Sequence, residues 1–335
     1  MELEPDCAKP APIFFNTVLH LTHIISFPIY TLTLIAMIRI KIKVFETYKY
    51  YLIVHTIINV LFEIYTSFLM VPTHYAPAPV IRSSGLLTHF KVNGLIQFNI
   101  FVSFVQATAC SIMEMFFFRY KTSVMDYKQL KFTYFLQANI YIYRIVFISN
   151  FVIGYIPPLY DPNGQHEALV RLVKADPELP IEVTCYSSVM ANFGNIIMYI
   201  NIYSWSVLMI VSFTIPTTSM CYIKHSWNNG INFSPQTLKI QKMLLTSLII
   251  QTTIHYTMIA LPTVVLLCVI AGDFSYPRFI YGIIVICNSH GSGSTIALII
   301  FTKPIREGIF KLIPCIKKKE RIIPVIDKST TNIVE

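Results

Sequence analysis

Residues 13–38 read IFFNTVLHLTHIISFPIYTLTLIAMI, and this stretch decides the fold. It contains no aspartate, glutamate, lysine or arginine, and it is long enough for a helix to cross a hydrocarbon core of about 30 Å. Comparable apolar runs follow at 50–71, 92–118, 133–157, 190–222, 243–270 and 279–302. The pattern predicts an all-α membrane protein in which seven helices span the bilayer.

The composition of the whole chain agrees with a membrane protein. Of the 335 residues, 54% are hydrophobic and 13% are charged, whereas about a quarter of the residues in soluble domains are charged. The net charge of +9 comes from lysines and arginines that lie between and after the apolar runs. This distribution favours contact with membrane lipids over binding of nucleic acid.

The basic residues also predict how the chain is oriented. They are concentrated in the connectors 39–49, 119–132 and 223–242 and in the tail, which share one side of the membrane if there are seven spans. An excess of lysine and arginine marks the cytoplasmic side, so we expect the N-terminus outside. The chain then divides into an extracellular segment 1–12, a seven-helix domain 13–302 and a cytoplasmic basic tail 303–335.

Stretches along nearly the whole chain carry a family resemblance. They are LHLTHIISFPIY (19–30), VPTHYAPAP (71–79), IPPLYDPNGQHEALVRLVKADPEL (156–179), FSPQTLKIQKMLLTSLIIQ (233–251) and NSHGSGSTIALIIFTKPIREG (288–308). In this order they resemble the nematode serpentine receptors of class H, with class I as the nearest similar family. Two positions depart from the family pattern: Ile305 stands where the family has Tyr, and Ile254-His255 stands where it has Ile-Pro.

The resemblance implies a helix bundle of the G-protein-coupled receptor type. Such a receptor would lie in the plasma membrane of sensory neuron cilia, bind a small odorant or pheromone from outside and activate a heterotrimeric G protein. The expected coupling residues are at the inner ends of the third and sixth spans: Arg119, Tyr120, Lys239, Gln241 and Lys242. Alternatively, Arg119 only anchors its helix by reaching the lipid headgroups.

Polar residues within the spans suggest an internal site. Glu63 lies in the middle of the second span, where an unpaired charge is costly and normally faces the bundle interior. Partners that could complete an ion or proton site with it are on the seventh span: Asn288, Ser289 and Ser292. Glu63 could equally serve packing alone, as a protonated, hydrogen-bonded carboxyl. Arg144 in the fourth span also needs a partner, for which Glu114 is a candidate.

By resemblance, the ligand is expected between the third, fifth, sixth and seventh spans. Residues that could line this pocket are Gln97, Phe98, Phe101, Tyr199, Asn201 and Tyr203. Each of them could instead pack against lipid or another helix. Pro216 and Pro262 lie inside the fifth and sixth spans, where they predict kinks, with or without a role in switching.

The orientation exposes Cys7 and Cys185 to the oxidising side of the membrane. Cys110 is too deep in the third span to reach them, by about 27 Å along the helix. We therefore expect a disulfide between Cys7 and Cys185, with two free thiols as the alternative.

After the last span, an apolar stripe predicts a short amphipathic helix on the membrane. Cys315 follows this stripe beside a run of lysines, a setting typical of reversible acylation. The sequence contains no motif with metal-ligand spacing and none that suggests an enzyme or a cofactor. Rival functions are a ligand-gated channel with inverted topology and a transporter. Whether the protein forms a dimer is left open.

Overall fold

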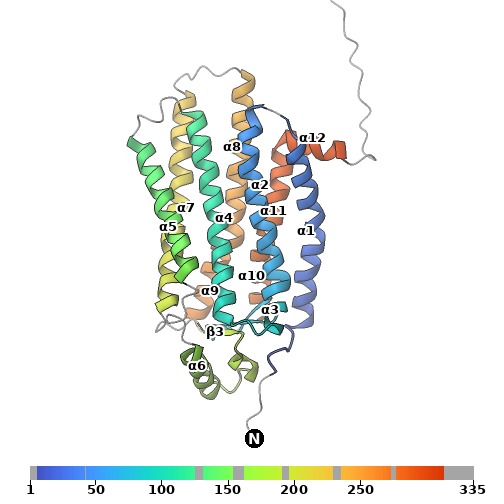
Figure 1. Ribbon diagram of the computed structural model, residues 1–335, viewed down its shortest axis with the longest axis vertical. Coiled ribbons are helices and arrows are strands. Elements are labelled where there is room, and N and C mark those ends of the chain that lie inside the picture. Colours follow the sequence, from blue (N-terminus) through green and yellow to red (C-terminus); the bar gives the residue numbers. More distant parts are fainter. Residues whose placement is uncertain are drawn as a thin grey trace, which may run out of the picture.

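The computed structural model describes residues 6–41, 43–124, 131–153, 162–190, 196–228, 235–272 and 277–312. Long helices run side by side along the longest axis of the molecule (Figure 1). They are α1 (Ile13–Arg39), α2 (Lys43–Ile64) with the π-helical turn η1 (Tyr65–Met70), α4 (Gly94–Ser123), α5 (Lys131–Ile153), α7 (Ile196–Asn228), α8 (Pro235–His255) with the π-helical turn η5 (Tyr256–Ala260) and α9 (Leu261–Ala271), and the pair α10 (Pro277–Asn288) and α11 (His290–Phe301).

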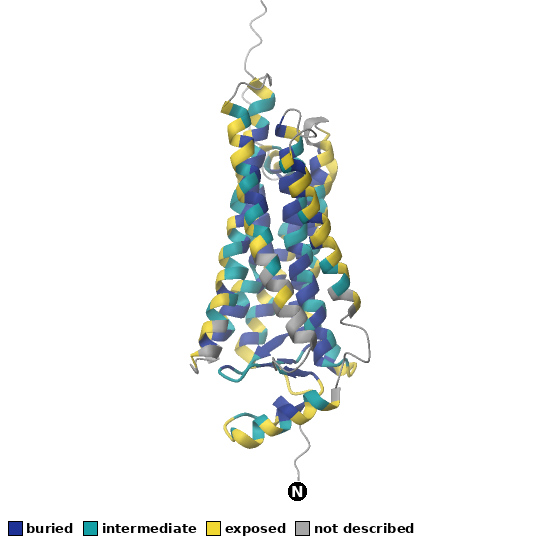
Figure 2. Cartoon of the chain, turned by 90° about the vertical axis from the view of Figure 1, so that its left-hand side faces the viewer, coloured by how far each residue is buried: buried dark blue, intermediate teal, exposed yellow. Residues whose placement is uncertain are grey.

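Several of these segments are long and apolar enough to cross a membrane. Within the described residues they are Ile13–Arg39, Glu46–Met70, Gly94–Ser123 and Pro235–Leu266, with Arg278–Asn288 and His290–Phe301 as a further span bent by 43°. Together with α5 and α7, which run beside them (Figure 1), they correspond to the seven predicted spans. Large apolar side chains such as Ile13, Phe14 and Ile145 are exposed on the outside of the bundle, where Figure 2 shows most exposed residues. A lipid environment explains this exposure.

One end of the bundle, which we call the disulfide end, carries a small cap. A disulfide joins Cys7, just before α1, to Cys185. A three-stranded antiparallel sheet is formed by β1 (Pro72–His74), β2 (Val80–Ser83) and β3 (Ser188–Met190), with Thr73 opposite Arg82 and Ile81 opposite Val189. The short helices α3 (Leu86–His89), α6 (Pro162–Ala175) and the 3₁₀ turn η4 (Ile181–Thr184) complete the cap.

The opposite end carries α12 (Lys303–Leu312), which lies across the bundle axis (Figure 1); we call it the α12 end. Ile305 and Ile309 are buried, and a Cβ on Gly308 would touch Ala36 of α1. The predicted amphipathic helix is therefore present, but part of its apolar stripe packs on the protein rather than on lipid. Cys315 lies outside the described residues.

The largest core cluster occupies the half of the bundle nearest the α12 end. Its buried residues come from most of the long helices and include Met37, Leu52, Phe116, Leu136, Leu248 and Ile305. A smaller cluster near the disulfide end holds the start of α1 against α10, with Phe15, Leu19 and Ile280 among its members. Apolar side chains are therefore packed against one another toward both ends of the bundle.

Pro262 explains the break in the sixth span. A proline lacks a backbone N–H and its ring clashes with the carbonyl four residues earlier, which here belongs to Met258. The π-helical turn η5 lies at this point, and a π turn widens the helix and redirects the side chains in it. Pro216 lies inside α7.

Candidate functional site

At the α12 end, Arg119 links the third span to the sixth. Its side chain is 1% exposed, its Nη1 donates a hydrogen bond of 2.8 Å to Oε1 of Gln241 on α8, and its guanidinium lies 3.5 Å from the ring centroid of Tyr48 on α2. Among the described residues it has no ion pair with a carboxylate. The amide and the aromatic face offset only part of the free-energy cost of removing the guanidinium from water.

The other expected coupling residues surround this contact. Tyr120 is buried, and its hydroxyl shares a hydrogen bond of 2.9 Å with Thr133 of α5. Lys239 and Lys242 are exposed on α8, with Lys242 5.9 Å from the ring of Trp227. Arg119 and Gln241 thus bind each other inside the bundle, whereas both lysines remain on its surface.

Glu63 is fully buried, and its hydrogen-bond partners come from the first span. Ser26 donates to Oε1, and Tyr30 donates to Oε2 at 2.8 Å. His23 lies 3.5 Å from the same carboxylate. The partners expected from the seventh span are not those of Glu63. The partners predicted from the sequence did not include these α1 residues, although His23, Ser26 and Tyr30 recur at i, i+3 and i+7 and so share one helix face.

The expected residues of the seventh span bond elsewhere. Asn288 accepts from Thr66 and donates to Ser67 at 2.9 Å, about one turn beyond Glu63 along α2 and η1. Ser289 and Ser292 donate to carbonyls of their own helix segment, those of Val285 and Ser289. One helical turn is longer than these side chains can reach, so Glu63 and Asn288 belong to two separate hydrogen-bond networks.

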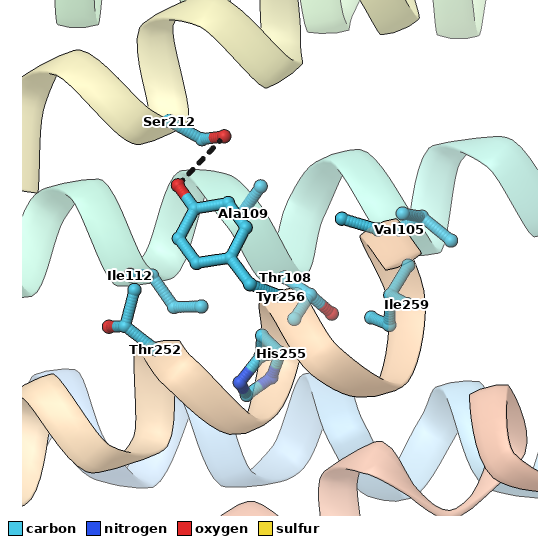
Figure 3. A pocket seen from close by; sticks show the side chains of 10 residues that line it. Val105, Thr108, Ala109, Ile112, Ser212, Thr252, His255, Tyr256 and Ile259 are labelled. Carbon is cyan, nitrogen blue, oxygen red and sulfur yellow. Dashed lines mark hydrogen bonds between the residues drawn. The ribbon is translucent and has the colours of Figure 1, made fainter. Parts of the chain in front are cut away.

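A cavity of about 50 Å³ lies between α4, α7, α8 and η5 (Figure 3). The residues that line it are Val105, Thr108, Ala109, Ile112, Ser212, Thr252, His255, Tyr256, Ile259 and Ala260. Tyr256 donates a hydrogen bond of 3.3 Å to Ser212 across it. Both the third and the sixth span therefore contribute to this cavity and to the Arg119–Gln241 contact.

The four residues expected in the ligand pocket whose side chains the structure describes do not line this cavity. Gln97 is buried and donates to the carbonyl of Val92, Phe98 packs on Phe101, and Phe101 also contacts Phe62. Tyr203 is 69% exposed on the outside of α7. The side chains of Tyr199 and Asn201 lie outside the described residues. A role for these six in ligand binding stays a prediction, and the described cavity is nearer the middle of the bundle.

At the disulfide end, the pairing of Cys7 with Cys185 is the one expected from the sequence. Nearby, the Lys9 ammonium donates to Glu182, and the Arg82 guanidinium donates to the carbonyls of Cys7 and Lys9. The hydrogen bond from Lys9 lowers the pKa of Glu182, with Arg82 adding to the effect and partial burial opposing it. The N-terminal segment is therefore held by one covalent bond and several charged contacts.

Arg144 pairs with Glu114, its candidate partner. The two are joined through Nε at 2.8 Å and through Nη2, and the Arg144 side chain is 45% exposed on the bundle surface. Among the described residues, no group of histidine, cysteine and acidic side chains is arranged to hold a metal ion.

The family model described as "Serpentine type 7TM GPCR chemoreceptor Srh" matches residues 10–315. It therefore covers the long helices, the cap at the disulfide end and α12. No curated protein matches the chain.

Proposed function

Because this chain belongs to the Srh family of serpentine seven-transmembrane chemoreceptors, we propose that it binds a small molecule inside its helix bundle and activates a heterotrimeric G protein. In this proposal the disulfide end faces outside and the α12 end faces the cytoplasm, in the plasma membrane of a sensory cell. The charge distribution supports this orientation, since the connectors at the α12 end carry most of the basic residues.

The hydrogen bond between Arg119 and Gln241 is the observation that best supports coupling. It joins α4 to α8 at the end of the bundle where a G protein would bind. His255 at the cavity and Gln241 lie on the same continuous helix, α8, with about 21 Å between them along its axis. A ligand that moves this helix at the cavity would therefore also move Gln241 away from Arg119.

In this proposal, ligand binding shifts the population between two conformations of the receptor. A ligand that binds better when α8 is displaced favours the state in which the Arg119–Gln241 bond is broken. Arg119 would then be available to the G protein, together with the exposed Lys239 and Lys242. Glu63 with Ser26 and Tyr30 joins the first two spans and is proposed as a polar site that differs between the two states.

The test is nucleotide exchange on a purified heterotrimeric G protein, catalysed by the receptor in lipid nanodiscs. The Gln241→Leu variant removes the acceptor that holds Arg119. We expect its ligand-free exchange rate to rise about tenfold, since a hydrogen bond to a charged group contributes about 1.5–3 kcal/mol. The Arg119→Ala variant is expected to lose catalysed exchange.

The control is Thr246→Val, an exposed position on the same helix, which should leave the exchange rate unchanged. Wild-type exchange that persists in Arg119→Ala would contradict the proposed role of Arg119. Failure of the wild-type receptor to activate any class of G protein, with or without candidate odorants, would contradict the function itself.

A further inference from the structure

The ion pair of Arg144 with Glu114 lies on the outside of the bundle, at a depth where lipid is expected. The Arg144 side chain is exposed and that of Glu114 is partly exposed. Along the axis of α5, Arg144 is about 20 Å from Lys131 at the α12 end. This distance is longer than an arginine side chain, so the guanidinium does not reach the headgroups at that end. Charged groups in such a position normally face other protein groups or water and not lipid.

The ion pair leaves hydrogen-bonding groups of both residues unused. The bonds from Nε and Nη2 of Arg144 both end on Oε1 of Glu114. A guanidinium has five N–H donors and a carboxylate accepts through two oxygens. Within the described part of the chain, Nη1 of Arg144 and Oε2 of Glu114 form no hydrogen bond. Hydrocarbon tails cannot provide one, so the pair needs a polar partner at its own depth.

Arg144 belongs to a stripe of exposed side chains that follows the outer face of α5. We call this the α5 stripe; its members are Tyr134, Gln137, Tyr141, Arg144 and Ile148, and all of them are exposed. They succeed one another at steps of three and four residues, which places them on one side of the helix. The same alternation of steps forms the seam along which two parallel helices pack. The α5 stripe therefore has the spacing of a helix–helix contact.

The face around the ion pair is formed by three helices. The helices α2, α4 and α5 lie next to one another (Figure 1), and Tyr51 of α2 interacts electrostatically with both Glu114 and Arg144. On α5 itself, the Arg144 guanidinium lies 5.4 Å from the ring centroid of Tyr141. This face is on the side of the bundle. A partner bound there leaves both the disulfide end and the α12 end accessible.

From this geometry we propose that the α5 stripe is the interface of a symmetric dimer, in which a second copy of this chain supplies the polar partner. A twofold axis along the membrane normal keeps both copies in the same orientation, so their ion pairs lie at the same depth. Nη1 of Arg144 then donates to Oε2 of Glu114 in the other copy, and the reverse contact forms with it. Positive and negative groups alternate around the resulting cluster of four charges.

Charge complementarity favours a second copy over a different protein. The partner has to present a donor and an acceptor side by side, at this depth and on an exposed face, and the chain itself carries that set. Because a twofold interface brings the same patch of both copies together, one ion pair satisfies the other without any further residue. The dimer goes beyond the proposed receptor function, and neither requires the other.

The test is energy transfer between receptors that carry a donor or an acceptor fluorophore at the C-terminus, in liposomes at rising lipid-to-receptor ratios. Wild-type transfer should persist after dilution has abolished transfer between randomly placed receptors. Arg144→Leu combined with Glu114→Leu leaves no unpaired charge, and should raise the dissociation constant of the dimer at least about tenfold. The matched control is Lys303→Leu with Glu307→Leu, which removes an exposed ion pair of α12 and should leave transfer unchanged.

Mixing two single variants tests the twofold symmetry. Arg144→Leu keeps only the carboxylate, and Glu114→Leu keeps only the guanidinium. Neither variant can form the ion pair with its own kind, whereas a mixed dimer contains one pair between the two copies. We expect the mixed dimer to have a dissociation constant at least about fivefold lower than either single-variant dimer.

A cysteine cross-link locates the interface without changing the ion pair. The chain used has its exposed cysteines Cys221 and Cys268 replaced by serine. Tyr134→Cys places a thiol on the α5 stripe, close to the twofold axis, and should form a disulfide with the same residue of the other copy under mild oxidation. Ile38→Cys, which is exposed on α1 near the same end of the bundle, is the control and should not cross-link.

Three results would overturn the proposal. Wild-type receptors that show only random transfer would exclude the dimer and leave a different membrane protein to cover the α5 stripe. A variant without both charges that associates as tightly as the wild type, or a mixed dimer no tighter than the single-variant dimers, would exclude the reciprocal ion pairs. Cross-linking of Ile38→Cys in place of Tyr134→Cys would put the interface on another face.

Discussion

Gly291 shows how a single residue controls the approach of three spans. A Cβ at this position would lie 2.5 Å from the hydroxyl of Tyr30 and 2.8 Å from Cβ of Asn59. The first of these groups donates to Glu63, so any shift that makes room for a methyl group also disturbs the buried carboxylate. The seventh span can therefore pack this closely on the first two only because this residue has no side chain.

Gly291→Ala is accordingly expected to lower the stability of the protein by about 1–3 kcal/mol, the usual cost of overpacking a core. Its midpoint of thermal unfolding should fall below that of the wild type. The matched control is Gly282→Ala in α10, where an added Cβ meets nothing within 4 Å. This control should unfold at or slightly above the wild-type temperature, because alanine favours a helix. Equal midpoints for the two variants would contradict the packing argument.

At the scale of elements, the cap depends on its tie to the N-terminal segment. The Cys7–Cys185 disulfide closes a loop with a sequence separation of 178 residues, and cross-linking residues so far apart restricts the unfolded chain. Cys7→Ser should reduce the free energy of unfolding by about 2–4 kcal/mol. It should also remove the difference in gel mobility between oxidised and reduced protein.

Cys221→Ser is the control for this variant, because Cys221 is a free, exposed cysteine of α7. It should retain both the wild-type mobility difference and the wild-type stability. If the two variants behave alike in both measurements, Cys7 and Cys185 exist as free thiols.

The ion pair of the same cap predicts a pH dependence. The pKa of Glu182 is lowered in the folded protein, first by its hydrogen bond from Lys9. A lowered folded pKa means that this contribution is complete above the unfolded pKa of about 4.3. It is lost as the pH falls through the lower, folded value. Stability of the cap against acid therefore depends on this carboxylate.

Glu182→Gln should be less stable than the wild type at neutral pH, with the difference shrinking as the pH falls below about 4.3. The measurement is the unfolding midpoint of both proteins as a function of pH. A difference that stays constant down to pH 3, on the order of one unit below the unfolded pKa, would show that Glu182 acts by packing and not by charge. Because Lys9 is largely exposed, the effect should also weaken with added salt.

For the whole molecule, the decisive property is the orientation in the membrane. The basic connectors and tail predict that the disulfide end lies outside. An N-terminal epitope tag should then bind antibody on intact cells, whereas a C-terminal tag should do so only after the cells are made permeable. The reverse labelling would contradict coupling to a cytoplasmic G protein and favour the channel of inverted topology.

Across the bundle, the predicted spans can be compared with the observed bounds of the helices. The predicted spans 92–118, 190–222 and 243–270 correspond to α4, α7 and α8 with its continuation. Of these, α4 runs on to Ser123, α7 runs on to Asn228 and α8 begins already at Pro235. Hydropathy reports the membrane-buried part of a helix, whereas polar turns beyond the lipid remain helical because neighbouring helices support them. The positions of the spans were therefore predictable, but their lengths at the α12 end were not.

The sequence by itself determined the fold class, the number of spans and the family. These depend on apolar runs long enough to cross a bilayer and on motifs in a fixed order, both of which are local properties of the chain. The pairing of Cys7 with Cys185 was also predictable, since few cysteines share their side of the membrane.

Only the tertiary structure decided which polar side chains meet. Glu63 bonds to Ser26 and Tyr30 instead of Asn288, Arg119 lies on Tyr48, and Thr108 and His255 line the same cavity. In helices that are apolar on nearly every face, hydropathy does not show which face turns inward. That choice depends on close contacts between distant residues, such as those of Gly291 with Tyr30 and Asn59, and these exist only once the helices have packed.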